Sequence, residues 1–89
     1  MRAVITVIGQ DKIGIIAEVS RVLAEHKINV LDITQTIMQD MFTMIMLVNL
    51  EKSEVNFKEI SKKLEDLGEA MSLSIRIQHE DLFRSMHRI

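Results

Sequence analysis

The spacing of apolar residues changes along the chain and predicts alternating strands and helices. Residues 2–8 are almost wholly apolar or β-branched, which is typical of a strand buried on both faces. Between residues 13 and 27 apolar positions recur every three or four residues, as on one side of a helix, with Asp11 as the expected N-cap. Residues 28–39 alternate between apolar and polar, as in a strand with one buried face. Residues 41–50 are apolar at odd and even positions alike, as in a strand buried on both faces.

The second half of the chain repeats the order of helix and strand. We expect a helix that is capped by Ser53 and stops at Gly68, followed by an alternating strand over residues 72–78. The apolar positions of this second helix are Phe57, Ile60, Leu64 and Leu67. Residues 80–89 form a final helical pattern with apolar positions at Leu82, Phe83, Met86 and Ile89.

This order is β-α-β-β-α-β plus a terminal helix, which predicts an α+β ferredoxin-like sandwich. Right-handed crossovers then give a four-stranded antiparallel sheet with both main helices on one face and strands 1 and 3 in its centre. The pattern agrees, because residues 2–8 and 41–50 are apolar on both sides while the other two strands alternate. We expect residues 1–78 to form one domain and residues 79–89 a helical extension. That extension, a second copy or both must cover the sheet face that lacks helices.

Composition limits the function classes. A domain of 89 residues without cysteine has a marginal core and no disulfide to stabilise it, so self-association is expected. The net charge is −2 and acids and bases are interspersed, which argues against a nucleic-acid partner. No apolar run is long enough to span a membrane, and the start of the sequence lacks a signal-peptide layout. We therefore expect a cytoplasmic protein with no membrane partner.

Two short segments carry a resemblance to a known family. From Val7 to Ala17 a strand leads through an Asp-x-x-Gly turn, Asp11 to Gly14, into a helix, which resembles the opening of ACT domains. Asn29 and the residues around it resemble the start of strand 2 in that family. The resemblance covers residues 2–78 and is greatest to the ACT domains of glycine cleavage repressor-like regulators and formyltetrahydrofolate deformylases. The chain also resembles stand-alone bacterial ACT proteins.

The resemblance implies a homodimer or larger assembly. It places a ligand site where the loop after strand 1 meets the start of strand 2 near a partner subunit, and typical ligands are amino acids and similar metabolites. The deformylases carry a catalytic domain after the ACT unit, which this chain lacks, so their activity does not transfer. A regulated enzyme or regulator is then a further expected partner, and no cofactor is implied.

The candidate ligand site therefore combines that loop with the start of the second strand. Its residues are Gly9, Gln10, Asp11, Lys12, Ile13, Gly14, Ile15, Asn29, Val30 and Asp32. Free amides at the helix start would hold a carboxylate, while Asn29, with Asp11 or Asp32, would read an amino group. The alternatives stay open: Asp11 as a helix cap only, Gly14 as a packing glycine and Asn29 as a turn residue.

Metal and catalytic sites are not predicted. Four methionines straddle a turn and fall on both faces of a strand, so adaptable packing at an interface is the better interpretation: Met38, Met41, Met44 and Met46. The three histidines have no metal-ligand spacing and are expected at the surface: His26, His79 and His87.

Some enzymes have a ferredoxin-like fold, so the loop after strand 1 was compared with the loop that their activity requires. An acylphosphatase needs an arginine in the loop after strand 1, where this chain has Asp11 and Lys12.

The leading hypothesis is a non-catalytic regulatory module that binds a small metabolite and acts in trans on another protein. The alternative is a protein–protein interaction module that has lost its ligand.

Overall fold

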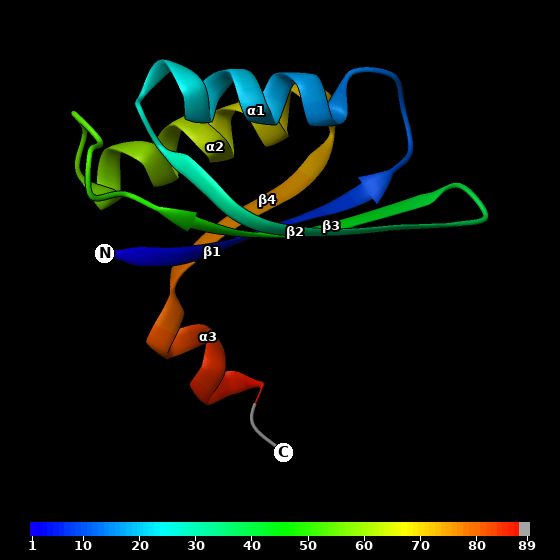
Figure 1. Cartoon of the computed structure of the whole chain (residues 1–89). Helices are drawn as coiled ribbons and strands as arrows, with labels where there is room; N and C mark the ends of the chain where they lie inside the picture. Colours follow the sequence, from blue (N-terminus) through cyan, green and yellow to red (C-terminus); the bar gives the residue numbers. More distant parts are fainter. Residues whose placement is uncertain (88–89) are drawn as a thin grey trace.

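The computed structural model describes residues 1–87 and contains a four-stranded antiparallel sheet with the strand order β2-β3-β1-β4. In chain order the elements are β1 (Arg2–Gln10), α1 (Ile15–Glu25), β2 (Asn29–Met38), β3 (Met41–Asn49), α2 (Phe57–Met71), β4 (Leu73–His79) and α3 (Glu80–Met86). Helices α1 and α2 lie on one face of the sheet, and α3 extends from the opposite side (Figure 1). The predicted ferredoxin-like fold is confirmed, with β1 and β3 in the centre.

The core lies between the two main helices and the sheet face that they cover. Strand register places Ile5 beside Met46, and Val7 beside Met44, and all four side chains are buried there. Apolar residues of the two helices close this layer from above, with Ile60 of α2 fully buried. Met44 and Met46 therefore serve as core packing, to which the flexible thioether side chain is well suited.

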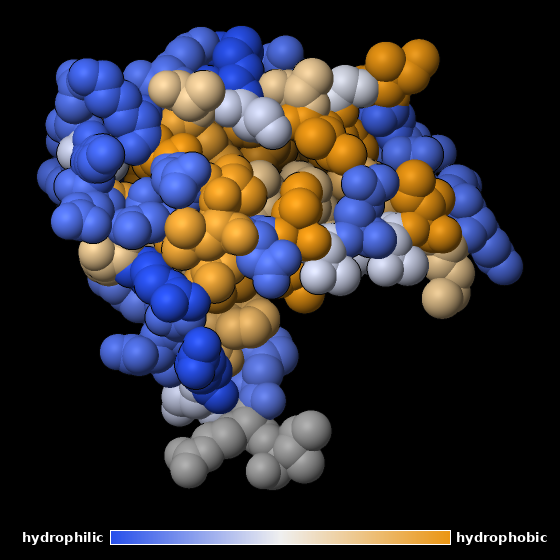
Figure 2. Space-filling model, viewed as in Figure 1, coloured by the Kyte–Doolittle hydropathy of each residue, from blue (hydrophilic) through white to orange (hydrophobic). Residues whose placement is uncertain are grey.

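Strand β2 departs from its predicted burial. The alternation predicted one dry face, but all ten residues of β2 are exposed. Two helices are too few to cover four strands, so the helix-facing side chains of this edge strand, including Ile33 and Ile37, remain in contact with solvent. Figure 2 faces this edge and shows apolar surface across it. A bulge between Val30 and Asp32 also shifts the register.

Helix α1 begins two residues later than predicted, and Asp11 does not cap it. Its N-cap residue is Gly14, whose φ of 93° lies in the left-handed region that favours glycine. The chain turns at this glycine, so the helix starts at Ile15. Asp11 instead donates its backbone N–H to the carbonyl oxygen of Asp40 at 2.7 Å, which ties the loop to the β2–β3 hairpin.

Helix α2 also starts later than predicted. Asn56 is its N-cap, and the side-chain oxygen of Asn56 accepts the backbone N–H of Glu59 at 2.8 Å. Ser53 forms a local turn with Val55 instead: its hydroxyl accepts the Val55 N–H at 3.2 Å and donates to the Val55 carbonyl at 2.9 Å. The prediction that Ser53 caps this helix is therefore wrong, because a second capping residue lies closer to the apolar stripe.

Gly68 does not end helix α2, which continues to Met71. The helix ends at Ser72, which adopts the left-handed conformation with a φ of 57°. A Cβ atom at Gly68 would lie 2.7 Å from the carbonyl oxygen of Leu73 on β4. Gly68 is therefore a packing glycine that allows the helix to approach the strand closely.

Helix α3 covers only part of the sheet face opposite the main helices, called the open face below. An ion pair of 2.9 Å between Arg2 and Glu80 joins α3 to β1, and Val4 beneath it is only 6% exposed. Farther along the strands, Ile8 remains 43% exposed and Ile45 38% exposed. The predicted apolar position Ile89 lies outside the described residues. Within residues 1–87, every helix is too short or too polar to span a bilayer.

Candidate functional site

The amino end of α1 offers free backbone donors. The first intrahelical hydrogen bond runs from the N–H of Glu18 to the carbonyl oxygen of Gly14, at 2.9 Å. The three N–H groups before Glu18 have no partner within the helix, and no described side chain caps them. Apart from Gly14 and its two chain neighbours, no described atom lies within 4 Å of the position of a Gly14 Cβ, so the space beside this turn is open. Such an end suits a carboxylate, because the donors and the helix dipole both favour negative charge.

An open hollow of about 240 Å³ lies beside this helix end. Asp11 and Gly14 form one side of it, and Gln35, Ile37 and Phe42 from β2 and β3 form the other. A small ligand here would meet donors at the helix end, the Asp11 carboxylate, the Gln35 amide and an apolar wall. Sequence reasoning missed Gln35, although the alternation of β2 places it with Ile33 and Ile37 on the helix-facing side.

Other residues of the loop serve the fold. The ammonium group of Lys12 donates to the backbone carbonyl of Met71 at the end of α2, although Lys12 also lines the hollow. Ile13 is fully exposed, whereas Ile15 is buried in the core. Gly9 and Gln10 are the last two residues of β1 rather than part of the turn.

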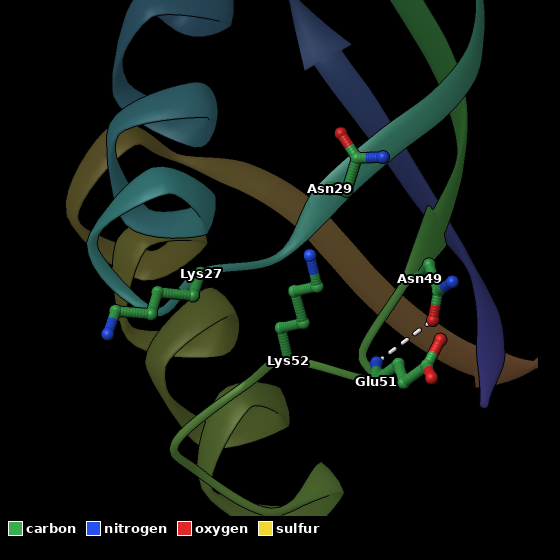
Figure 3. A pocket seen from close by; sticks show the side chains of 5 residues that line it. All are labelled: Lys27, Asn29, Asn49, Glu51 and Lys52. Atoms are coloured by element: carbon green, nitrogen blue, oxygen red, sulfur yellow. Dashed lines mark hydrogen bonds between the residues drawn. The ribbon is translucent and has the colours of Figure 1, made fainter.

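Asn29 lies in a second hollow, of about 270 Å³, at the start of β2 (Figure 3). Asn49, its cross-strand neighbour on β3, accepts the backbone N–H of Glu51 on its side-chain oxygen at 2.9 Å. Lys52 extends toward Asn29, while the ammonium group of Lys27 points away. No pattern in the sequence indicated that Lys52 would reach this hollow.

The ammonium group of Lys27 pairs with the Glu54 carboxylate at 2.6 Å. Their hydrogen bond, followed by the attraction between the two charges, raises the pKa of Lys27 and lowers the pKa of Glu54. Both side chains are well exposed to solvent, so this pair contributes little to holding Lys27 in a fixed position beside the second hollow.

The two hollows are not joined within one chain. Helix α1 has eleven residues and so spans about 16 Å, with Gly14 before its first residue and Asn29 beyond its last. Asp32 pairs with Leu47, which places it on the open face, away from the loop. There its carboxylate accepts the backbone N–H of Ile33 at 2.8 Å. Val30 is exposed on the helix-facing side of β2.

Metal-ligating side chains do not gather in the described part of the chain. Residues 1–87 contain no group of three or more histidine, aspartate or glutamate side chains placed to hold a metal ion. Met38 and Met41 are exposed beside the β2–β3 hairpin, whereas the other two methionines of this region are buried in the core. The ring of His79 stacks on Phe57 with a centroid distance of 4.2 Å.

Comparison with known proteins identifies the family. The sequence model of the ACT domain matches residues 2–78. The chain belongs to the ACT domain family. It is 56% identical to a UPF0237 protein of Clostridium acetobutylicum, over 100% of both chains. ACT domains are regulatory, commonly oligomerise, and typically bind amino acids or other small metabolites.

Solved structures confirm the predicted resemblance. An ACT domain protein from Streptococcus pneumoniae superposes with a TM-score of 0.81 at 37% identity, over 93% of each chain. A protein described as a glycine cleavage system transcriptional repressor gives a TM-score of 0.74 at 27% identity, over 86% of this chain and 44% of that one. A formyltetrahydrofolate deformylase from Pseudomonas syringae shares the fold, with a TM-score of 0.80 at 21% identity, over 88% of this chain and 27% of that one.

Proposed function

We propose that this ACT domain is a non-catalytic regulatory module that binds an amino acid or a similarly small metabolite. The observation that carries the proposal is the uncapped amino end of α1, which opens onto a hollow lined by Asp11 and Gln35. An α-amino acid offers a carboxylate for the backbone donors and an ammonium group for the Asp11 carboxylate. The chain acts in trans, as a homo-oligomer that contacts a separate enzyme or regulator.

A second copy completes the site by supplying Asn29. If two β2 edges meet antiparallel about a twofold axis, the start of one β2 lies beside the end of the other. The hydrogen bond between Asp11 and Asp40 holds the loop near that end of β2. Asn29, which its register with Asn49 places on the open-face side at the first position of β2, then lies beside the end of the other copy's β2, next to the loop at Gly14. The edge suits such pairing, because all ten residues of β2 are exposed and it contains neither lysine nor proline.

Charge supports the antiparallel arrangement. Lys52 lies near the start of β2, in the hollow of Asn29, while Asp11 and Asp40 lie near the end of β2. Antiparallel pairing brings Lys52 of each copy toward Asp11 and Asp40 of the other, and the twofold axis repeats this match. Both ends also carry residues of the opposite sign, Glu51 beside Lys52 and Lys12 beside Asp11.

Thermal unfolding with a panel of amino acids and small metabolites tests the proposal. A ligand at about 100 times its dissociation constant adds about 2.7 kcal/mol of stability, which gives a clear rise in Tm. We expect one class of ligand to raise the Tm of the wild type and of the control Ser74→Ala, which alters the far edge strand. The same ligand should have little effect on Asn29→Ala. No stabilisation by any member of the panel would refute ligand binding.

An interaction module without a ligand is the second candidate. The observation that favours it is the apolar surface left uncovered on β2, where Ile33 and Ile37 are exposed. In that case the protein would copurify with one stoichiometric partner protein, and metabolites would change neither the Tm nor the complex.

A further inference from the structure

Helix α3 lies beyond the residues that the ACT domain model matches, and it packs only lightly on its own chain. The ion pair between Arg2 and Glu80 and a hydrogen bond from Gln78 to the sulfur of Met86 hold it at one end of the open face. None of the residues of α3 from Glu80 to Met86 is buried. A helix of two turns is not stable in water by itself, so its position needs more contacts than these.

The apolar side chains of α3 are left largely in solvent. Leu82 is 51% exposed and Met86 is 60% exposed. The adjoining sheet has the same character, because Ile8 and Ile45 on the open face are also uncovered. Figure 1 shows α3 projecting from this side of the sheet, so the surface has a step, with the helix at one end and bare sheet at the other.

The centre of the open face carries no charge. Cross-strand register assigns ten positions of β1 and β3 to this face, and the six central ones are aliphatic or threonine: Val4, Thr6, Ile8, Thr43, Ile45 and Leu47. Charged residues stand around this centre: Asp32 on β2, Arg76 on β4, and Arg2 at the end of β1, where it pairs with Glu80 of α3. An uncharged centre with a polar rim is typical of protein–protein interfaces, and water screens charges at such a rim.

We propose that this open face, together with α3, is an interface between two copies of the chain. A twofold axis relates the copies, and their strands run in opposite directions across the interface. A stepped surface is filled best by its own copy rotated by a half turn, since each α3 then lies over the bare sheet of the other copy. Leu82 and Met86 of one copy cover Ile8 of the other. Ile45, in the middle row, meets its own equivalent at the twofold axis.

The surface area of the single chain fits this occupant. The chain exposes 5940 Å², whereas a monomer of 10.3 kDa is expected to expose about 5,400 Å². The excess of roughly 540 Å² is shared between the open face, α3 and the exposed β2 edge, and it compares with the roughly 800 Å² that each partner contributes to a stable interface.

The twofold axes of the two proposed interfaces are compatible with a closed assembly. The axis of the proposed face interface lies in the plane of the sheet and crosses the strands. The axis of the β2 edge pairing is perpendicular to the sheet. Two such axes can intersect at a right angle, which gives a closed assembly of four chains rather than an open fibre. The face interface does not depend on ligand binding or on the loop at Gly14, so it can be tested separately from the proposed function.

Light scattering coupled to size exclusion chromatography of the full chain tests the interface. Ile45→Glu places a charge at the twofold axis, and Leu82→Glu places one on α3, outside the core, where it cannot disrupt the fold of the sheet. Ala70→Glu on the exposed side of α2 is the matched control, because it adds the same charge to the opposite layer. We expect the wild type and Ala70→Glu to share one mass, and both open-face variants to show half of it at the same concentration.

The outcomes separate the two interfaces. A wild type of four chains that falls to two supports both the open face and the β2 edge. A wild type of two chains that falls to one supports the open face and removes the edge pairing from the proposed function. A monomeric wild type, or a mass that neither Ile45→Glu nor Leu82→Glu changes, overturns the inference.

Discussion

Replacing Gly68 with alanine tests how closely α2 packs against β4. The new Cβ would lie 2.7 Å from the carbonyl oxygen of Leu73 and 3.2 Å from Cγ1 of Ile75. The first contact is with backbone, so it can be relieved only by moving the helix away from the strand. Overpacking of this kind costs about 3 kcal/mol at the upper end of its usual range. Alanine normally gains about 1 kcal/mol over glycine within a helix, so we expect a net loss of about 2 kcal/mol.

Urea unfolding at a fixed protein concentration measures this loss, because association also contributes to stability. Ala70→Gly is the calibration. It lies in the same helix on an exposed site, and it should lose about 1 kcal/mol through helix propensity alone. The reasoning fails if Gly68→Ala is more stable than the wild type by about 1 kcal/mol, since that result would mean that the helix propensity acts without any clash.

Three further predictions concern local features. Gly14→Ala should lose about 1–2 kcal/mol in thermal unfolding through its positive φ alone, and an unchanged Tm would contradict the left-handed turn. Asn56→Ala should lose about 1 kcal/mol and more than Ser53→Ala in urea unfolding, because only Asn56 caps α2; the reverse order would disprove the cap. The lowered pKa of Glu54 means that its pairing with Lys27 contributes stability above the ordinary carboxyl pKa of 4.5 and loses it as the pH falls through the lowered value. The urea midpoint should therefore fall more on acidification for the wild type than for Glu54→Gln, high salt should reduce this difference, and parallel curves would contradict the pairing.

The fold was predictable because its strands differ in a way that local sequence records. Residues 2–8 and 41–50 are apolar at both parities, and they form the central strands β1 and β3. The burial of β2 was not predictable in the same way. Its alternation is that of an amphipathic strand, but whether the apolar side is covered depends on how far two helices extend over four strands.

The ends of the helices were predicted less well, and the reason is physical. A glycine near the end of an apolar stripe most often terminates a helix, so Gly68 was interpreted as a stop. Its actual role is set by Leu73 and Ile75 on β4, and contacts with another element leave no local pattern. The start of α1 shows the same limit, because the turn at Gly14 rather than a capping carboxylate determines where that helix begins.

The residues of the candidate site differ in the same way in how far the sequence predicted their positions. The loop up to Gly14 was predicted from its own residues as part of a ligand site, and the structure places a hollow beside it that Gln35 also lines, as the strand alternation could have indicated. Asn29 and Asp32 were assigned to the same site, but the first lies at the far end of α1 and the second on the open face. Adjacency in the sequence pattern does not show which side of a bulged strand a residue faces.

The separation of Gly14 from Asn29 follows from the topology itself. In a β-α-β unit the loop before the helix and the strand after it are one helix length apart, here about 16 Å, which an amino acid cannot bridge. If both contact one ligand, they must come from different copies, and the ligand then binds the paired state more tightly than the single chain. Ligand binding and pairing of the chains then share one coupling free energy. A ligand that strengthens pairing is therefore bound more tightly by the paired protein than by the single chain, and by the same factor. An ACT domain paired in this way reports a metabolite concentration through its assembly state, and the proposed interface of α3 and the open face would stabilise that assembly independently of the ligand.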